Sequence, residues 1–441
     1  MFPIKNFFVH TLYKIITLAF TAVFGIYSIN GGLHEIPPET PEDFVPVLRF
    51  AVCSDIHLDG EENQTNAVRF AEMFRESYSY SKSHDKYNNL DAVMVCGDMT
   101  DWGREDEYEM YHKVVSENLR EGTQMLEVMG NHEFIEEREI EGVNAFDNYK
   151  KYVNNETEIH KIINGYHFIG ISYSDKNENF GDKTKWLDEQ LKIATKEDKN
   201  KPVFVFQHPH PTLTVYGSVN WSEISIRRVL EKYQQVVNFS GHSHYCSADP
   251  RTLWQGSFTA VGTGAIAGLM GNLNFINGDA YGSIDSGSYS IVEADAEGNI
   301  RIRVFDAVNK IFFDNCDYYL KNPANRLNRI YNWGNMYSLD TKPQFPENAE
   351  IEVSTNEADE TIISFPSAKG YFEAESYKIT VSDGLKVKYE NTVLSSYTTA
   401  VEDNLSVNLG ILNEGVYQVK IKPSSPYAKQ GKALKGVITI K

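Results

Sequence analysis

Five short apolar segments of this chain end in residues that commonly bind metals, and this repetition constrains the fold most. One segment runs from Ala92 to Cys96 and is followed by Gly97 and Asp98. Five apolar residues in succession are typical of a strand that is buried on both faces of a sheet. Ligands of open α/β sheets bind at the carboxyl ends of the strands. The pattern therefore predicts an α/β fold whose functional residues gather at one edge.

The other four segments repeat this arrangement. Together the strand ends offer seven candidate ligands: Asp55, His57, Asp98, Asn131, His208, His242 and His244. A single histidine or Gly-Asp pair is usually structural, but five such ends at one edge indicate a common function. Imidazole nitrogens with carboxylate and amide oxygens suit Mn, Fe, Zn, Co or Ni better than Ca. Because these ligands exceed what one ion needs, we expect two divalent ions that share a carboxylate.

The first part of the chain alternates strands with helices. Strands are predicted at residues 48–54, 92–96, 125–129, 166–172, 202–206 and 236–239. Helices are predicted at residues 66–80, 105–119, 184–191 and 222–233. From about Thr252 to Phe313, short alternating runs separated by Gly-containing turns predict antiparallel strands. A parallel first half and an antiparallel second half suit a mixed sheet or two stacked sheets.

The last hundred residues predict a separate all-β domain, from 342 to 441. A proline-rich break at residues 342–346 precedes it. Short strands are predicted at residues 350–353, 361–365, 376–381, 386–389, 405–409, 415–421 and 436–440. Such spacing is typical of a fibronectin-III-like or Ig-like β-sandwich, and Tyr417 lies where the corner tyrosine of such sandwiches does.

The amino-terminal segment predicts export. Lys5 and Lys14 precede an apolar stretch from Ile15 to Ile29, which is short for a full membrane span. We expect residues 1–30 to be a signal peptide or membrane anchor and residues 31–45 a linker. A buried helix of a soluble fold is the alternative. An exported chain would be secreted or anchored to the outer face of a bacterial cytoplasmic membrane, with membrane contact only through this segment.

The composition limits the partners. A formal net charge of −19 argues against duplex nucleic acid, whose binding needs clustered Lys and Arg. An anionic substrate could approach only if local cations offset this charge, and bound metals would do so. The four cysteines have no metal-site spacing; Cys53 and Cys96 lie in apolar runs and are expected to pack in the core. In an exported protein an oxidised pair is the alternative.

The order of these blocks resembles the calcineurin-like metallophosphoesterase superfamily. The family pattern is D-x-H, G-D-x-x-D, G-N-H-E/D, a lone His and G-H-x-H. This chain carries Asp55-Ile-His57, Gly97 to Asp101, Gly130 to Glu133, His208, and Gly241 to His244. The resemblance covers residues 46 to about 310. It implies an α/β (α+β) four-layer sandwich of two mixed β-sheets flanked by helices, in a domain of residues 46–341.

The resemblance also implies a mechanism. Asp55, His57, Asp98 and His244 would hold one ion, and Asp98, Asn131, His208 and His242 the other. A shared Asp98 would keep the ions about 3.5–4 Å apart, which suits in-line displacement at phosphorus. A metal-bridging hydroxide would attack, His132 would protonate the leaving alkoxide as general acid, and Asp101 would orient His132. For Asp101, a cap of the following helix is the alternative.

Two further residues bear on the substrate. Trp102 stands where protein phosphatases of the superfamily carry Arg, which argues against that activity and favours a stacking or apolar substrate group. His208 is nearer the strand end than His210, so His210 is expected to be a substrate contact or a surface residue.

The sequence therefore predicts an exported phosphoesterase with two divalent ions, of which Mn, Fe and Zn are the best candidates. The substrate would be a small phosphate mono- or diester or a wall polymer, and the C-terminal domain is a candidate for binding a surface partner. The alternative is a catalytically silent scaffold of the same fold at the cell surface.

Overall fold

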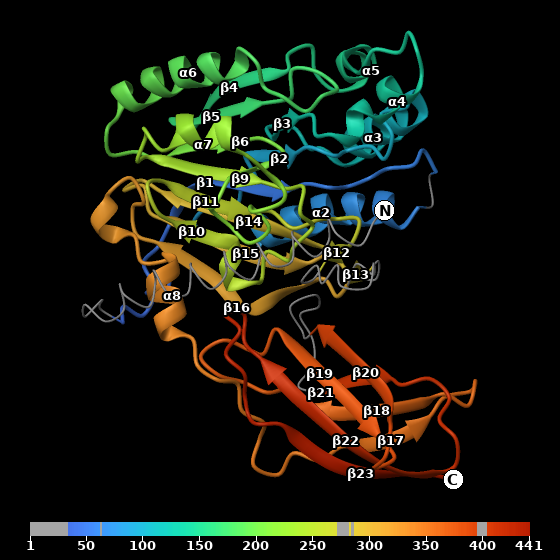
Figure 1. The fold of residues 1–441 in the computed structure, drawn as a ribbon. Helices are drawn as coiled ribbons and strands as arrows, with labels where there is room; N and C mark the ends of the chain where they lie inside the picture. The colour runs from blue at the N-terminus through green and yellow to red at the C-terminus, as the bar shows by residue number, and fades with distance from the viewer. Residues whose placement is uncertain (1–33, 62–63, 271–281, 284–285, 395–403) are drawn as a thin grey trace.

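The computed structural model describes residues 34–61, 64–270, 282–283, 286–394 and 404–441. The predicted signal peptide or anchor, residues 1–30, lies outside the described residues. Within the described ranges, no helix combines the length and the apolar character needed to cross a membrane. A large body of strands and helices is followed by a smaller, strand-rich C-terminal region below it in Figure 1.

The first sheet of the large body is mixed. In spatial order its strands are β16 (Ile311–Leu320), β15 (Ile300–Asp306), β14 (Ser288–Asp295), β1 (Pro46–Cys53), β2 (Ala92–Cys96) and β3 (Gln124–Val128). The strands β1, β2 and β3 are parallel, whereas β14, β15 and β16 continue the sheet in antiparallel pairs. The late strand β14 therefore lies beside the first strand of the domain.

The second sheet is also mixed. Its order is β10 (Leu253–Gln255), β11 (Thr259–Gly262), β9 (Val236–Ser240), β6 (Val203–Phe206), β5 (Tyr166–Ile171) and β4 (Glu158–Ile163). The four central strands are parallel, and the two edge strands, β4 and β10, pair in antiparallel fashion. The prediction of mixed sheets is thus confirmed.

Both faces of the parallel strands are buried over most of their length, which explains why these strands are mainly apolar. On β1, Phe50 and Val52 contribute to the core between the sheets, while Ala51 and Cys53 contribute to the core beneath the helices. The Phe50 ring contacts the rings of Phe168 and Phe204 from the second sheet, with centroids 5.1 and 5.0 Å apart. Truncating such a fully buried phenylalanine to alanine typically costs about 3–5 kcal/mol.

Four helices connect successive parallel strands and pack against the sheets: α2 (Thr65–Lys82), α3 (Glu105–Asn118), α6 (Lys183–Glu197) and α7 (Ile224–Leu230). The other helices of the described residues are α4 (Ile135–Glu139), α5 (Ala145–Tyr152) and α8 (Trp333–Leu339). Short 3-10 turns are η1 (His132–Phe134), η2 (Pro250–Thr252) and η3 (Arg326–Asn328), and short strands are β7 (His210–Pro211), β8 (Ser222–Glu223), β12 (Leu269–Met270) and β13 (Gly282–Ser283). Apolar residues of α2 such as Phe70 and Phe74 pack in the same core as Ala51 and Cys53.

The helix predicted at 222–233 is shorter in the structure. It occupies Ile224–Leu230 because Ser222 and Glu223 instead pair as β8 with β7. The Glu223 side chain then accepts a hydrogen bond from Ser225 N at 2.7 Å and caps the helix.

The C-terminal region consists of two packed sheets. One has the order β17 (Glu352–Thr355), β18 (Thr361–Pro366), β21 (Asn404–Asn408), and the other β20 (Val387–Leu394), β19 (Ser376–Ser382), β22 (Gly415–Ser424), β23 (Leu434–Ile440). Their inward residues, including Ile363, Tyr377 and Ile421, form a core of their own. The Tyr417 hydroxyl donates to Asn413 O at 2.9 Å, as a corner tyrosine does. A strand-rich region was predicted; its assignment as fibronectin-III-like or Ig-like stays a prediction.

Candidate metal centre

The seven candidate ligands all lie on loops that directly follow strands. Asp55 and His57 follow β1, Asp98 follows β2, Asn131 follows β3, His208 follows β6, and His242 and His244 follow β9. The first three strands belong to one sheet and the last two to the other. The centre therefore forms where the carboxyl ends of the two sheets meet, and neither sheet alone supplies it.

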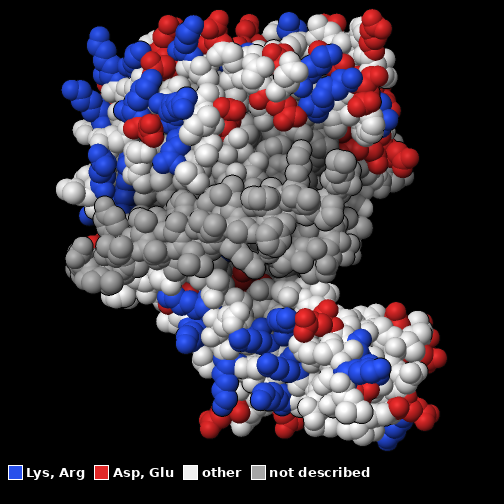
Figure 2. Space-filling view, viewed as in Figure 1, with Lys and Arg blue, Asp and Glu red and all other residues white. Residues whose placement is uncertain are grey.

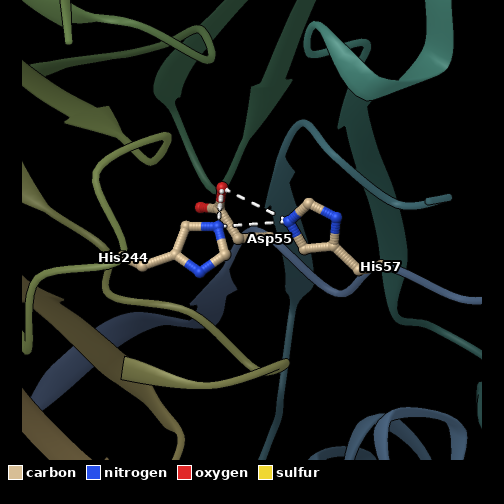
Figure 3. A group of neighbouring side chains, drawn as sticks. All are labelled: Asp55, His57 and His244. Atoms are coloured by element: carbon tan, nitrogen blue, oxygen red, sulfur yellow. Dashed lines mark hydrogen bonds and ion pairs between the residues drawn. The ribbon is translucent and has the colours of Figure 1, made fainter. Parts of the chain in front are cut away.

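Asp55, His57 and His244 form one group of potential ligands, shown in Figure 3. His244 Nε2 lies 3.1 Å from Asp55 Oδ1 and 3.1 Å from His57 Nε2. His57 Nε2 is 4.0 Å from Asp55 Oδ1. One ligand atom from each side chain lies within 4.8 Å of the other two, so a single ion could contact all three.

Asp98, His208 and His242 form the second group. His208 Nε2 lies 3.0 Å from Asp98 Oδ2, 3.0 Å from His242 Nδ1 and 2.9 Å from Asn131 Oδ1. Asp98 Oδ2 is also 3.9 Å from His57 Nε2, which belongs to the first group. Asp98 thus lies between the two groups, where a shared carboxylate would be needed.

The charges of this centre fit a divalent cation. Asp55 and Asp98 are buried, and burying an ionised carboxylate is costly unless a positive charge compensates it. Burial would raise the pKa of Asp98, but the charge and hydrogen bond of His208 hold it well below its usual value. Burial lowers the pKa of His208, and Asp98 overrides this and raises it to about 9. Imidazolium protons thus compensate the carboxylates here, and a metal would replace them.

The backbone is strained at five of the seven candidate ligands. Asp55, His57, Asp98, His242 and His244 have φ values of +53°, +51°, +52°, +73° and +55°. Residues with side chains avoid this left-handed region, and such conformations cost of order 1–3 kcal/mol each. The surrounding structure must therefore hold these five residues in place, so the directions of their side chains are set before any metal arrives.

Glycines in the motifs are required by close approach to the ligands. A Cβ atom on Gly130 would lie 2.2 Å from Asp98 Oδ1, and one on Gly241 would lie 2.4 Å from Asp55 Oδ2. Either contact would displace a candidate ligand. The glycines of G-N-H-E and G-H-x-H therefore make room for the carboxylates.

His132 and Asp101 lie beside the first group and form a third group of potential ligands with His57. His132 Nδ1 is 2.8 Å from the backbone oxygen of Asp101 and 3.6 Å from its Oδ1. The same carboxylate lies 3.4 Å from His57 Nδ1. Burial lowers the pKa of His132, but Asp101 and the charge of Asp98 outweigh it and raise the pKa to about 10. The His132 side chain is 29 % exposed, so it combines a retained proton with access to solvent.

The alternative role of Asp101 as a helix cap is wrong. Helix α3 begins at Glu105, and its N-cap residue is Arg104. Glu107 accepts from the backbone N–H of Arg104 at 3.1 Å, and so satisfies the free N–H at the start of this helix.

Of the two residues proposed to meet the substrate, Trp102 is exposed and His210 is buried. Trp102 directly follows Asp101 and is 42 % exposed, so it can meet a molecule that approaches the centre. His210 is only 1 % exposed, and its ring nitrogens lie 2.8 Å from the hydroxyls of Ser240 and Ser243. The surface alternative for His210 is therefore wrong. Its ring instead holds the segment that carries His242.

Sequence reasoning gave no role to Glu133, although it is part of the G-N-H-E block. Its buried carboxylate accepts hydrogen bonds from the backbone N–H groups of Asp98 at 3.0 Å, Thr100 at 2.9 Å and Gly130 at 2.6 Å. Glu133 thus ties the loop after β2 to the loop after β3. A carboxylate directly after the histidine of the block was the signal that could have revealed it.

Residues 48–246 match the calcineurin-like phosphoesterase model. The calcineurin-like phosphoesterase domain so defined starts in β1 and contains all seven candidate ligands, His132 and Asp101. A calcineurin-like phosphoesterase domain with grouped metal-binding side chains indicates a metal-dependent hydrolase.

Comparisons with whole proteins add little to this domain assignment. The protein TT1561 of Thermus thermophilus is 12 % identical with a TM-score of 0.37, over 59 % of this chain and 99 % of that one. The glycoside hydrolase domain of Endo-D from Streptococcus pneumoniae R6 is 7 % identical with a TM-score of 0.23, over 86 % of this chain and 73 % of that one. Both likenesses are too low to carry an argument. No curated protein matches the chain.

Proposed function

We propose that this chain is an exported hydrolase of phosphate esters that works with two divalent ions. The observation that carries the proposal is the joining of five loops into two adjacent groups of ligands, with Asp98 between them. The calcineurin-like phosphoesterase match supports the reaction class. The finer fold proposal is that the sheets and helices form four layers, followed by a fibronectin-III-like or Ig-like sandwich.

The ligands divide between two ions as follows. Asp55, His57, His244 and Asp98 would hold one ion, and Asp98, Asn131, His208 and His242 the other. Mn, Fe and Zn suit this mixture of imidazole, carboxylate and amide donors. When bound, the two ions would supply Lewis acidity to the phosphoryl oxygens and activate a water molecule for attack.

Side chains of the protein would handle the leaving group. The N–H at Nδ1 of His132 donates to the backbone oxygen of Asp101, so the other ring nitrogen carries the proton that can be transferred. The Asp101 carboxylate would favour the protonated ring, whose pKa it raises, and would fix its orientation. His132 would then protonate the departing alkoxide as a general acid, a role typically worth about 10²–10⁴-fold in rate. Trp102, exposed beside Asp101, would contact the group that leaves.

A direct test measures hydrolysis by the purified full chain loaded with Mn, Fe, Zn or Ni. We expect turnover of p-nitrophenyl phosphate, bis-p-nitrophenyl phosphate or both, and loss of turnover in Asp98→Asn, which removes the shared carboxylate. No hydrolysis of either ester with any of the metals would favour the silent scaffold. A panel of monoesters, cyclic nucleotides and glycerol-phosphate polymers would then assign the substrate class.

We propose that residues 1–30 direct export of the chain. The support for this proposal is the basic flank and the apolar stretch that follows it. Cell fractionation with detection of the C-terminal region would test it, and recovery of the intact chain with the cytoplasmic proteins would contradict it.

We also propose that the C-terminal region binds an anionic wall polymer. Basic side chains are frequent on the face of this region seen in Figure 2. In the sheet formed by β20, β19, β22 and β23, Lys378 lies opposite Lys422, and Lys420 lies opposite Lys435. Like charges directly opposite one another destabilise a sheet. In the part of the chain that the structure describes, Glu390 pairs with Lys378 at 3.0 Å, whereas no acidic partner accompanies the other three.

This polymer proposal can be tested by co-sedimentation with poly(glycerol phosphate) at low and high salt. We expect binding by the wild type that weakens with salt and is lost in Lys420→Glu/Lys422→Glu. The matched control is Lys161→Glu/Lys196→Glu, which changes the net charge equally on the exposed surface of the large body. Equal binding by both variants would contradict the proposal, and binding to anionic lipid vesicles alone would indicate a membrane surface instead.

A further inference from the structure

The Glu375 carboxylate of the C-terminal region contacts the large body. Glu375 directly precedes β19, and its backbone N–H donates to Ser424 O at 2.8 Å inside the C-terminal region. Its carboxylate bonds to the guanidinium of Arg251, which lies in η2. Glu375 is only 6 % exposed. A buried ion pair thus joins two regions that are far apart in the sequence.

Arg251 binds a second carboxylate from its own domain. Its Nε donates to Asp249 Oδ1 at 2.9 Å, and its Nη2 donates to Asp249 Oδ2 at 2.5 Å. A buried guanidinium is costly unless its charge is paired and its N–H groups are hydrogen-bonded. Because Asp249 remains a partner in any case, loss of Glu375 would not leave Arg251 as an unpaired buried charge.

Aromatic rings continue from Arg251 to the ligand loop, which we define as residues 240–246. The Arg251 guanidinium carbon lies 3.5 Å from the centroid of the Tyr216 ring. The Tyr216 ring stacks on that of Tyr245, with centroids 4.3 Å apart and planes inclined by 21°. The Tyr216 hydroxyl also donates to Glu375 Oε1 at 3.4 Å. Tyr245 directly follows His244, a candidate ligand.

The segment after Tyr216 contacts the ligand loop at two more points. A Cβ atom on Gly217 would lie 2.7 Å from Ser243 Cβ, so the backbones approach closely there. The Trp221 ring packs edge-on against the His242 ring, with centroids 5.0 Å apart. Residues 216–221 therefore touch the Arg251–Glu375 pair on one side and the loop of both histidines on the other.

We propose that Glu375 is a positioning residue of the metal centre. Through Arg251 and Tyr216 it fixes the ligand loop and hence the directions of His242 and His244. Both histidines have left-handed backbones, which only surrounding contacts can maintain. The effect on metal binding rests on the function proposed above, whereas the effect on the loop itself does not.

The test compares full-length variants that differ in this one connection. Glu375→Ala removes the carboxylate, and Glu375→Gln keeps a hydrogen-bond acceptor for Arg251 without the charge. The matched control is Lys429→Met. Lys429 Nζ donates to Tyr337 O and to Asp340 O, both at 2.7 Å, so this variant weakens the same junction without touching the ligand loop.

Two measurements are made on each variant: hydrogen–deuterium exchange of peptides covering the ligand loop, and the Mn²⁺ dissociation constant by calorimetry. We expect Glu375→Ala to speed exchange in the loop and to weaken binding of one ion about tenfold, the lower end for residues that orient ligands. Glu375→Gln should recover part of both effects. Lys429→Met should leave the loop exchange and the Mn²⁺ dissociation constant at wild-type values, even if its melting temperature is lower.

Unchanged loop exchange in Glu375→Ala would overturn the inference, as would equal acceleration in Lys429→Met. Absence of Mn²⁺ binding by the wild-type protein would instead overturn the proposed function. Because the exchange comparison needs no metal, the two failures can be told apart.

Discussion

Replacing His132 with alanine should separate proton donation from metal binding. The contact of His132 with Asp98 is made by the backbone N–H, which donates to Asp98 Oδ1 at 2.9 Å and survives the substitution. The His132 ring packs edge-on against the His57 ring, with centroids 4.3 Å apart. It belongs to a third group of potential ligands, with His57 and Asp101, but contributes no atom to the two groups assigned to the ions. Metal content should therefore stay at the wild-type level.

Turnover should depend on the leaving group. For an alkyl phosphate ester, whose alkoxide must be protonated as it departs, we expect kcat to fall about 10²–10⁴-fold. This corresponds to about 2.7–5.4 kcal/mol of transition-state stabilisation. For a p-nitrophenyl ester the leaving anion is stable near neutral pH, so the loss should be about tenfold or less, below the range for general acids.

The assay measures kcat for both esters in the wild type, His132→Ala and the control His112→Ala, with metal content determined by elemental analysis. His112 lies on α3 and its ring bonds to Tyr152 O, so its removal should leave both rates unchanged. Equal losses for the two esters in His132→Ala, or loss of an ion, would refute the assignment of His132 as the acid.

Three further substitutions address other parts of the molecule. His208→Ala should lower the content of one ion, because its Nε2 faces Asp98 and His242, and equal metal content would contradict that ligand assignment. Gly130→Ala should lower both the metal content and the melting temperature, because its Cβ would lie 2.2 Å from Asp98 Oδ1. Wild-type values of both would show that the loop after β3 can move to accommodate the methyl group. Burial raises the pKa of Glu127 to about 7 in the folded chain, above its value of 4.5 when unfolded. Its carboxyl is protonated in both states below about pH 4.5, whereas between about pH 4.5 and 7 only the unfolded state ionises. The free energy of unfolding therefore falls across this range and stays constant above it. Glu127→Gln should add about 3 kcal/mol at pH 8 and little at pH 4, and denaturant unfolding at both pH values checks this.

The sequence predicted the parallel strands well because each is buried on both faces. In β1, the residues on both faces are buried, and they are apolar apart from Arg49, which pairs with Glu293 at 2.7 Å. The ends of the strand therefore lie within two residues of the prediction. The start of α7 was missed because Ser222 and Glu223 pair with β7, a tertiary contact that helical periodicity does not contain.

The sequence motif identifies the candidate ligands, but it does not predict their backbone conformation. Left-handed φ values are common for Gly and uncommon for other residues, among which Asn, Asp and His adopt them most often. Nothing in the local sequence predicts that His57 and His244 do so. The pairing of Arg251 with Glu375 was also beyond prediction, because it joins residues 124 positions apart and no local pattern marks it. Side chains that support the site from a distance are therefore visible only in the folded molecule.

The position of β14 beside β1 sets the order in which the centre can be completed during synthesis. His244 is made before β14, which spans Ser288–Asp295, so the sheet that presents Asp55 and His57 is unfinished when the last ligand emerges. A chain that is exported unfolded would then take up its metals only after translocation, from the ions of the outer compartment. Cells grown with Mn or Zn varied in the medium should yield protein whose metal content follows the medium, whereas constant content would indicate loading before export.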